Sequence, residues 1–326
     1  MGQAKIEQVC DVCGRMSDEV RARQPLVHLL TNYVTVTDCV NALLAVGARA
    51  ICSHAPEEAA QVTRGADALV CNLGGTEYYD AMELSFAAAM EKGIPIVIDP
   101  VGCGASSHRR RMCLRLIGKH AQCISGGEIR GNEVCLAVRG NYAEIDALIS
   151  GHSDSPGLDD LQVLNDGEEQ TLERRMISFA KRNQVLLIAS GETDLCTDGT
   201  DLREIHCGTP ALRRITGAGC LSSAVLAAYL AAGSADAPRF PTGTGQSGTG
   251  SEAQTGAADR ERPGQGIHSG EPLEWAAAAV SRIGLAGESA LEASRRSGTG
   301  AGHFHMYLMD ALSAGDPLWQ GTASAS

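Results

Sequence analysis

Short aliphatic runs alternate with longer helix-forming segments along the chain, and this alternation limits the possible folds more than any other feature. The runs are rich in Val, Ile and Leu, as buried parallel strands are. They occupy residues 26–30, 50–53, 68–73, 94–99, 122–125 and 185–190. The helix-forming segments between them occupy residues 38–46, 57–64, 77–92, 109–119 and 168–183. We therefore predict an α/β fold, with a mostly parallel central sheet and helices on both faces.

The second half of the chain adds three helical patterns and one long interruption. The helical patterns lie at 219–232, 274–296 and 307–312. Residues 241–270 contain 8 Gly with Ser, Thr, Gln and Pro and almost no aliphatic side chain, so they bury too little apolar surface to offset the entropy of ordering. We expect an N-terminal helical extension at 1–24, a single domain at 25–313, a disordered insert within it at about 236–271, and a C-terminal tail at 314–326.

Composition and charge exclude several classes of protein. The chain has 27 Lys and Arg against 39 Asp and Glu, a net charge of −12, which opposes binding to a phosphate backbone. No run approaches the ~18 apolar residues of a spanning helix, and residues 1–24 lack the basic start and apolar centre of a signal peptide. The 12 Cys are spread over 326 residues, which favours reduced thiols. We expect a cytoplasmic protein that binds small molecules, with no nucleic-acid or membrane partner.

A Gly-x-Gly loop at the start of a helix is the strongest local signal. Thr216-Gly217-Ala218-Gly219-Cys220 directly precedes the helical run that begins at Leu221. Glycines allow a close approach of the backbone, and the free N–H groups and dipole of a helix start bind anions such as phosphate. A Cys at this position is expected to have a lowered thiol pKa. The alternative is a tight loop that uses glycine for its dihedral angles alone.

Polar residues follow two other predicted strands. Asp99 ends a buried run and precedes a glycine loop, at the edge of the sheet where open α/β sheets bind ligands. Its carboxylate could hold hydrated Mg²⁺ or cap the next loop. Ser190, Gly191 and Glu192 follow another run. The basic residues 109–111 are expected to start a solvated helix, and contact with nucleotide phosphates is the alternative.

Six segments, taken in order, resemble those of hydroxyethylthiazole kinases. They are His-Leu-Leu-Thr-Asn-Tyr-Val at 28–34, Asn-Ala-Leu-Leu-Ala-Val-Gly-Ala at 41–48, Ile-Asp-Pro-Val-Gly at 98–102, Ile-Arg-Gly-Asn at 129–132, Gly-Glu-Thr-Asp at 191–194 and Thr-Gly-Ala-Gly-Cys at 216–220. The match spans about residues 25–233 and resumes at 272–313. The resemblance implies a ribokinase-like fold and a function in thiamine salvage, in which ATP and Mg²⁺ serve to phosphorylate the hydroxyl of 4-methyl-5-(2-hydroxyethyl)thiazole.

The resemblance also implies roles for individual residues. Cys220 takes the catalytic position, where most relatives of this fold have an Asp base, and Gly217, Ala218 and Gly219 form the anion hole around the transferred phosphoryl group. The ATP-binding residues are Arg130, Asn132 and Ser190, and the substrate-binding residues are Cys52, Asn32 and Gly217. The family is typically a homotrimer with active sites between subunits, so Asn32 and its neighbours are expected near an interface.

One departure from the family pattern leaves alternatives open. The family follows Arg-Gly-Asn with two small residues and then a Glu that organises Mg²⁺, whereas Glu133 directly follows Asn132. Either Glu133 has moved into that role, or Glu128 replaces it, or Mg²⁺ binding is impaired; the candidate metal ligands are thus Asp99, Glu133 and Glu128. The competing functions are a kinase for another small vitamin-precursor alcohol and a catalytically silent protein that binds thiazole or nucleotide.

Overall fold

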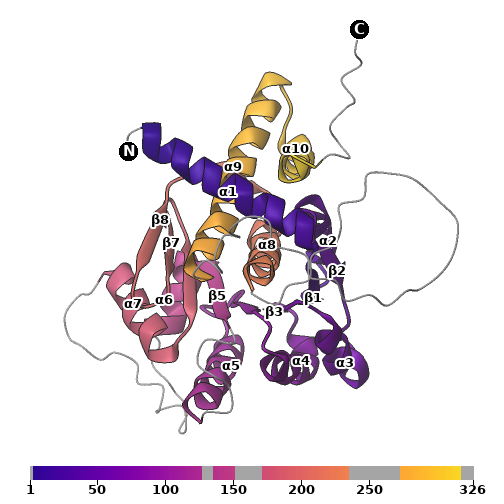
Figure 1. Ribbon diagram of the computed structural model, residues 1–326, viewed down its shortest axis with the longest axis vertical. Coiled ribbons are helices and arrows are strands. Elements are labelled where there is room, and N and C mark those ends of the chain that lie inside the picture. Colours follow the sequence, from indigo (N-terminus) through magenta and orange to yellow (C-terminus); the bar gives the residue numbers. More distant parts are fainter. Residues whose placement is uncertain (1–2, 127–134, 151–170, 235–271, 317–326) are drawn as a thin grey trace, which may run out of the picture.

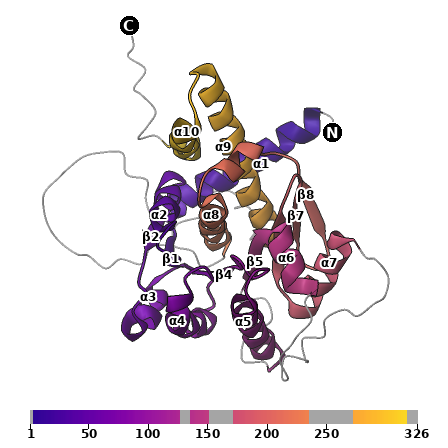
Figure 2. The ribbon, with the colours of Figure 1, turned by 180° about the vertical axis from the view of Figure 1, so that it is seen from behind.

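An eight-stranded sheet runs through the centre of the computed structural model, which describes residues 3–126, 135–150, 171–234 and 272–316 (Figures 1 and 2). The strand order is β2-β1-β3-β4-β5-β6-β7-β8. The strands are β1 (Leu26–Leu30), β2 (Arg49–Ile51), β3 (Ala68–Asn72), β4 (Ile96–Asp99), β5 (Leu136–Asn141), β6 (Leu186–Ser190), β7 (Asp194–Thr197) and β8 (Leu202–Ile205). Neighbours from β2 to β6 pair in parallel, and β7 and β8 add an antiparallel edge. The predicted α/β class and mostly parallel sheet are confirmed.

Helices cover both faces of the sheet, as predicted (Figure 1). One face carries α1 (Gln3–Arg23), α2 (Val36–Ala45), α8 (Ala218–Gly233), α9 (Pro272–Arg296) and α10 (Ala301–Ser313). The other carries α3 (Pro56–Gly65), α4 (Tyr79–Lys92), α5 (Ser107–Ser125), α6 (Tyr142–Ser150) and α7 (Leu172–Asn183). Short 3₁₀ turns lie at η1 (Thr76–Tyr78) and η2 (Pro210–Arg214). No helix in the described ranges is long and apolar enough to span a membrane.

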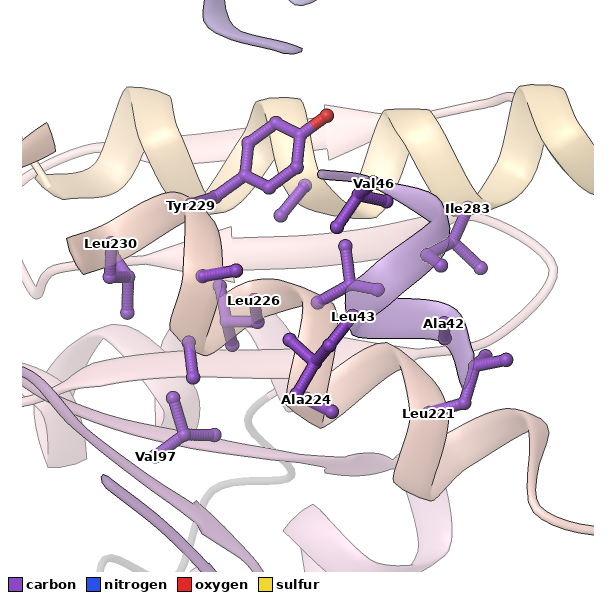
Figure 3. Close-up of a cluster of buried hydrophobic side chains, with 14 of the residues drawn as sticks. Ala42, Leu43, Val46, Val97, Leu221, Ala224, Leu226, Tyr229, Leu230 and Ile283 are labelled. Carbon is purple, nitrogen blue, oxygen red and sulfur yellow. The ribbon is translucent and has the colours of Figure 1, made fainter. Parts of the chain in front are cut away.

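The strands supply two separate hydrophobic cores. Side chains alternate between the faces of a pleated strand, so Val97 of β4 enters one core while Ile96 and Ile98 enter the other. Helix α8 is central to the first core, and all its residues from Cys220 to Ala232 are buried. Figure 3 shows it enclosed by side chains of α2, α9 and the sheet. A helix that is apolar on every side suits this central place.

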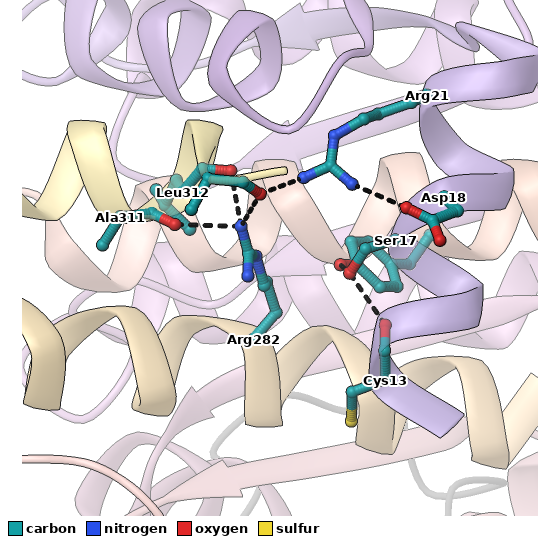
Figure 4. A network of polar contacts seen from close by, with 9 residues as sticks. Cys13, Ser17, Asp18, Arg21, Arg282, Ala311 and Leu312 are labelled. Atoms are coloured by element: carbon teal, nitrogen blue, oxygen red, sulfur yellow. Dashed lines mark hydrogen bonds and ion pairs between the residues drawn. The ribbon is translucent and has the colours of Figure 1, made fainter. Parts of the chain in front are cut away.

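Polar contacts join the outer helices of that face (Figure 4). Arg282 of α9 donates from Nη2 to the carbonyls of Ala311 and Leu312, at 2.9 and 2.8 Å, and Arg21 of α1 donates to the carbonyl of Ala314 at 2.6 Å. The carbonyls at a helix C-terminus attract cations, so both arginines stabilise the end of α10. Ser17 of α1 is hydrogen-bonded to the buried Tyr229 of α8. Helix α1 therefore packs as part of the core on this face.

Some of the observed elements differ from those predicted. Residues 122–125, predicted as a strand, form the last turn of α5, and the next strand is β5, which was not predicted. A run as short as Cys123-Ile124 cannot be separated from a helical segment by periodicity alone. The β7–β8 hairpin was also missed, because its strands have four residues each and β8 is half polar. The expected insert at about 236–271 and residues 317–326 of the tail lie outside the described residues.

Gly284 provides a test of the packing of α9. A Cβ at this position would lie 2.6 Å from the carbonyl oxygen of Cys207, so a larger residue forces the backbone apart. We expect Gly284→Ala to lower the free energy of unfolding by ~1–3 kcal/mol in urea denaturation followed by circular dichroism. Gly14→Ala in α1, where no atom lies within 4 Å of the added Cβ, is the control. It should raise stability by ~0.5–1 kcal/mol, and equal effects of the two variants would contradict the close α9 contact.

Candidate active site

Cys220 lies where helix α8 meets the carboxyl edge of the sheet. Its Sγ accepts a hydrogen bond from Asn72 Nδ2 at 3.1 Å and a longer one from Asn32 Nδ2 at 3.8 Å. Asn72 ends β3, and Asn32 follows β1, the neighbouring parallel strand. Strand ends that are adjacent in the sheet thus deliver two amides to one sulfur. The predicted residues Cys220 and Asn32 are brought together, and Asn72 is a member of the site that the sequence analysis missed.

Asn72 also connects Cys220 to the buried carboxylate of Asp99. Its Nδ2 donates to Asp99 Oδ2 at 2.9 Å, and Ser223 Oγ donates to the same oxygen at 3.0 Å. The two hydrogens of one amide group therefore serve the sulfur and the carboxylate. The amide oxygen accepts from Asn32 Nδ2 at 3.1 Å and from the Gly74 N–H at 3.0 Å. With all its hydrogen-bonding groups used, Asn72 has a fixed orientation.

Burial controls the protonation of both acidic groups. Burial raises the pKa of Asp99 to about 6, and Arg139 opposes this effect while Glu144 adds to it. Burial also raises the pKa of Cys220 to about 11, with the charge of Asp99 adding and hydrogen bonds from Thr35, Asn72 and Asn32 opposing. The expectation that the helix N-terminus lowers the thiol pKa is therefore wrong. Desolvation by burial is the largest cause of the raised pKa, and Cys220 is a neutral thiol at neutral pH.

The start of α8 has the backbone geometry of an anion site. Gly217 has a φ of +81°, in the left-handed region that favours glycine, and a Cβ there would lie 2.8 Å from Thr35 Cγ2. The Leu221 N–H donates to the Gly217 carbonyl as the first bond of the helix. The N–H groups of Ala218, Gly219 and Cys220 precede that bond and have no acceptor within the helix. The structure therefore shows the conformational role of Gly217, and its anion-binding role stays a prediction.

Arg139 of β5 ties the Gly-x-Gly loop to Ser190. Its Nη1 donates to the Gly219 carbonyl at 2.9 Å and its Nη2 donates to Ser190 Oγ at 2.6 Å. The sequence analysis missed this residue, although a signal was present. Residues 139–144 read Arg-Gly-Asn-Tyr-Ala-Glu, a second Arg-Gly-Asn nine residues after the first, and here the Glu follows at the family's spacing.

Glu144 lies on the same edge of the sheet as Asp99. Its Oε1 accepts from the N–H of Gly102, in the loop after β4, and its Oε2 accepts from the N–H of Asn141, both at 3.0 Å. Both hydrogen bonds that Asp99 accepts from described side chains end on Oδ2, so Oδ1 remains for another ligand. No group of three or more His, Cys, Asp or Glu forms a metal cage in the described ranges. Two carboxylates without a cage fit Mg²⁺ that keeps waters and bridges to phosphate.

The other predicted residues are placed less centrally or are not described. Cys52 follows the edge strand β2 and is exposed, and no hydrogen bond of the described residues joins it to Cys220. Arg130, Asn132, Glu133 and Glu128 lie outside the described residues. His28, in contrast, is a buried core residue that hydrogen-bonds to Thr63 Oγ1 and the Ser53 carbonyl, and burial lowers its pKa to about 4.

Comparison with known proteins adds to this geometry. The profile of the hydroxyethylthiazole kinase family matches residues 18–240. A hydroxyethylthiazole kinase from Clostridium beijerinckii is 32% identical over 306 residues, which are 92% of this chain and 91% of the relative. One from Nitratidesulfovibrio vulgaris strain DP4 is 36% identical over 214 residues, 65% of this chain and 73% of the relative. The solved structure of a hydroxyethylthiazole kinase from Pyrococcus horikoshii covers 92% of both chains, with a TM-score of 0.67 and 28% identity.

The buried carboxylate of Asp99 makes stability depend on pH. Its pKa rises from the ordinary 3.8 to about 6 on folding, so the folded chain retains a proton that the unfolded chain has lost between these values. The free energy of unfolding therefore falls as the pH rises through this window and stays lowered above it. We expect Asp99→Asn, measured without Mg²⁺, to be more stable than the wild type at pH 8 by ~1–3 kcal/mol. The difference should vanish near pH 4.

The exposed Asp80→Asn variant is the control for the loss of one negative charge. A constant destabilisation of Asp99→Asn from pH 4 to pH 8 would contradict the burial of a charged carboxylate.

Proposed function

Because this chain belongs to the hydroxyethylthiazole kinase family, we propose that it transfers the γ-phosphoryl group of ATP to the hydroxyl of 4-methyl-5-(2-hydroxyethyl)thiazole in thiamine salvage. The family is ribokinase-like, in agreement with the mostly parallel sheet. One observation carries the proposal to the site: Cys220, at the N-terminus of α8, shares the Asn72 amide group with Asp99. A thiol, a carboxylate and a helix N-terminus thus meet at one point of the sheet edge.

The proposed roles follow from what phosphoryl transfer requires, which is positioning and charge neutralisation more than covalent chemistry. The loop Gly217-Ala218-Gly219 forms the anion hole, in which the free N–H groups of Ala218 and Gly219 face the transferred phosphoryl group. Arg139 and Ser190 bind the nucleotide phosphates. Because Arg139 donates to the Gly219 carbonyl and to Ser190, it holds the two parts of the phosphate site at a constant separation.

Cys220 orients the acceptor alcohol in this scheme. With a pKa of about 11 Cys220 is a neutral thiol at neutral pH, so it does not take the proton of the alcohol before attack. The alcohol loses its proton late, when its oxygen has begun to bond to phosphorus and its own pKa has fallen, and the proton passes to an oxygen of the transferred phosphoryl group, whose second pKa is about 6. Asn32 and Asn72, which donate to the sulfur, keep it directed at the place of that oxygen. Electrostatic stabilisation by the anion hole and Arg139 therefore supplies most of the rate.

We assign Mg²⁺ binding to Asp99 and Glu144. Bound Mg²⁺ would neutralise the phosphates during transfer. The residues themselves support this assignment, because Glu144 raises the pKa of Asp99 by repulsion, which a cation between them would relieve. Glu144 also stands at the spacing from Asn141 that the family uses. The alternative of a catalytically silent binding protein was suggested by the early position of Glu133. Because Glu144 stands at the family's spacing from Asn141, that reason no longer applies.

A homotrimer remains part of the proposal. Tyr33 and Val34 directly follow Asn32 and are 77% and 60% exposed, and Ile51 is exposed beside Cys52. Exposed apolar side chains next to a site are typical of a surface that a partner covers. A second subunit packed there would enclose the substrate and would give Cys52 its proposed contact with the thiazole.

The three candidate glutamates can be separated by their effect on the Mg²⁺ requirement. We expect Glu144→Gln to raise the Mg²⁺ concentration for half-maximal activity by ~10-fold or more, because it removes a charged ligand beside Asp99. Glu133→Gln and Glu128→Gln, which make the same chemical change, should leave it within about twofold. The measurement is ADP release at varied Mg²⁺ concentration. A strong effect of either control with none from Glu144→Gln would reassign the metal ligand.

The role of Cys220 can be tested by the same assay with hydroxyethylthiazole as acceptor. We expect Cys220→Ala to lower kcat by ~10²-fold or more, because the alcohol loses the group that positions its oxygen for attack, while ATP binding is retained. Cys196→Ala, a buried cysteine in β7, is the control and should lower stability without a comparable loss of kcat. Loss of ATP binding by Cys220→Ala would make the residue structural. Faster turnover of another vitamin-precursor alcohol than of hydroxyethylthiazole by the wild type would replace the proposed substrate.

A further inference from the structure

Three consecutive arginines at the start of α5 have three different environments. Arg110 donates to the carbonyls of Ala147 and Leu148, at 2.9 and 3.3 Å, and so stabilises the end of α6. Arg111 is exposed. Arg109 extends back to the loop after β4, where its Nη1 donates to the Val101 carbonyl at 3.2 Å. Only Arg109 of these three thus reaches the edge of the sheet that carries the candidate active site.

The guanidinium of Arg109 lies beside the loop after β4, which is hydrogen-bonded to Glu144 of α6. Its Nη1 would be 2.7 Å from a Cβ on Gly102, and the Gly102 N–H is the donor to Glu144 Oε1. Gly102 has a φ of +70°, so glycine is favoured there by its backbone conformation as well as by the lack of space for a Cβ. On the other side, Arg109 is close enough to Tyr79, the first residue of α4, to oppose the burial that raises the pKa of Tyr79 to about 12. Arg109 therefore lies between the loops that follow β3 and β4.

Arg109 keeps most of its hydrogen-bonding capacity. A guanidinium has five N–H donors, and the Val101 carbonyl engages one of them. No carboxylate of the described chain forms an ion pair with Arg109. The side chain is half-buried, so a ligand can reach it. The site contains the carboxylates of Asp99 and Glu144, and ATP adds further negative charge. A cationic side chain on this side of the site offsets part of that charge.

We propose that Arg109 binds the terminal phosphate of ATP, opposite Arg139. This inference rests on the proposed kinase function. Arg139 and Ser190 lie on β5 and β6, whereas Cys220 contacts residues at the ends of β1 and β3. A triphosphate that runs from Arg139 and Ser190 toward Cys220 crosses the end of β4. Its terminal phosphate then lies closest to β3. That is the position of Arg109, and guanidinium groups suit phosphate because they donate two parallel hydrogen bonds.

Calorimetric titration of the full chain with ATP, ADP and AMP in the presence of Mg²⁺ tests the proposal. Arg109→Ala should weaken ATP binding by ~10-fold or more, the scale of one charge-assisted hydrogen bond, and should leave AMP binding within about twofold. ADP, which lacks the terminal phosphate, should be affected much less than ATP. Arg109→Lys should recover part of the ATP affinity, while Arg109→Gln should not. Arg111→Ala, which removes the same charge two residues away, is the matched control and should change none of the three.

The proposal is overturned if Arg109→Ala binds ATP as the wild type does, if it weakens ATP and AMP equally, or if Arg111→Ala has the same effect. Thermal unfolding identifies a variant that has lost its fold, and the comparison of Arg109→Lys with Arg109→Gln then decides in place of Arg109→Ala. A wild type that binds ATP but does not phosphorylate hydroxyethylthiazole contradicts the proposed substrate alone. The dependence of ATP binding on Arg109 remains measurable in that case.

Discussion

The burial of helix α8 on every side is the constraint on which the rest of the structure depends. Its residues from Cys220 to Ala232 are enclosed by the sheet and by α1, α2 and α9 (Figure 3). Between Leu221 and Ala232 the polar side chains of this helix are Ser222, Ser223 and Tyr229, so its free backbone polar groups are at its ends. The N-terminal end lies at the carboxyl edge of the parallel strands, so the unpaired N–H groups of the helix and the polar residues after β1, β3 and β4 converge. The packing of α8 in the core therefore also positions the N–H groups and the polar side chains of the site.

The site carries an energetic cost that its function explains. Asp99 is buried and has a raised pKa, and Cys220 is held as a neutral thiol by the same desolvation. A carboxylate that is costly in the free protein is a strong ligand for a cation that arrives with the nucleotide. Asn72 limits the cost, because its amide satisfies Asp99 and Cys220 at once. Under the proposed function, this cost in stability keeps a charged and fixed site for phosphoryl transfer.

The sequence holds two copies of Arg-Gly-Asn, at 130–132 and at 139–141. The first was selected, with Glu133 directly after it, whereas the second has a Glu at the family's spacing. The second copy ends β5, and Arg139 and the following Glu144 lie beside Ser190, Gly219 and Gly102. The sequence alone does not show where either copy lies in the fold. The structure shows that the second copy ends β5, which lies between β4 and β6 in the sheet.

Much of this protein could be predicted from local chemistry. The aliphatic runs specify buried parallel strands, the Gly-x-Gly before a small-residue helix specifies the glycine turn at the start of α8, and Asp99 specifies a polar strand end, because each depends on residues adjacent in sequence. The short β7–β8 hairpin and the end of α5 could not be predicted because their runs are too short or too polar for periodicity to identify. The partners of Cys220 could not be predicted because they come from segments distant in sequence. The pKa of Cys220 is the clearest case. Its place at a helix start predicts a lowered value, but the enclosure of α8 by elements from both ends of the chain raises it to about 11, because desolvation is a property of the assembled core.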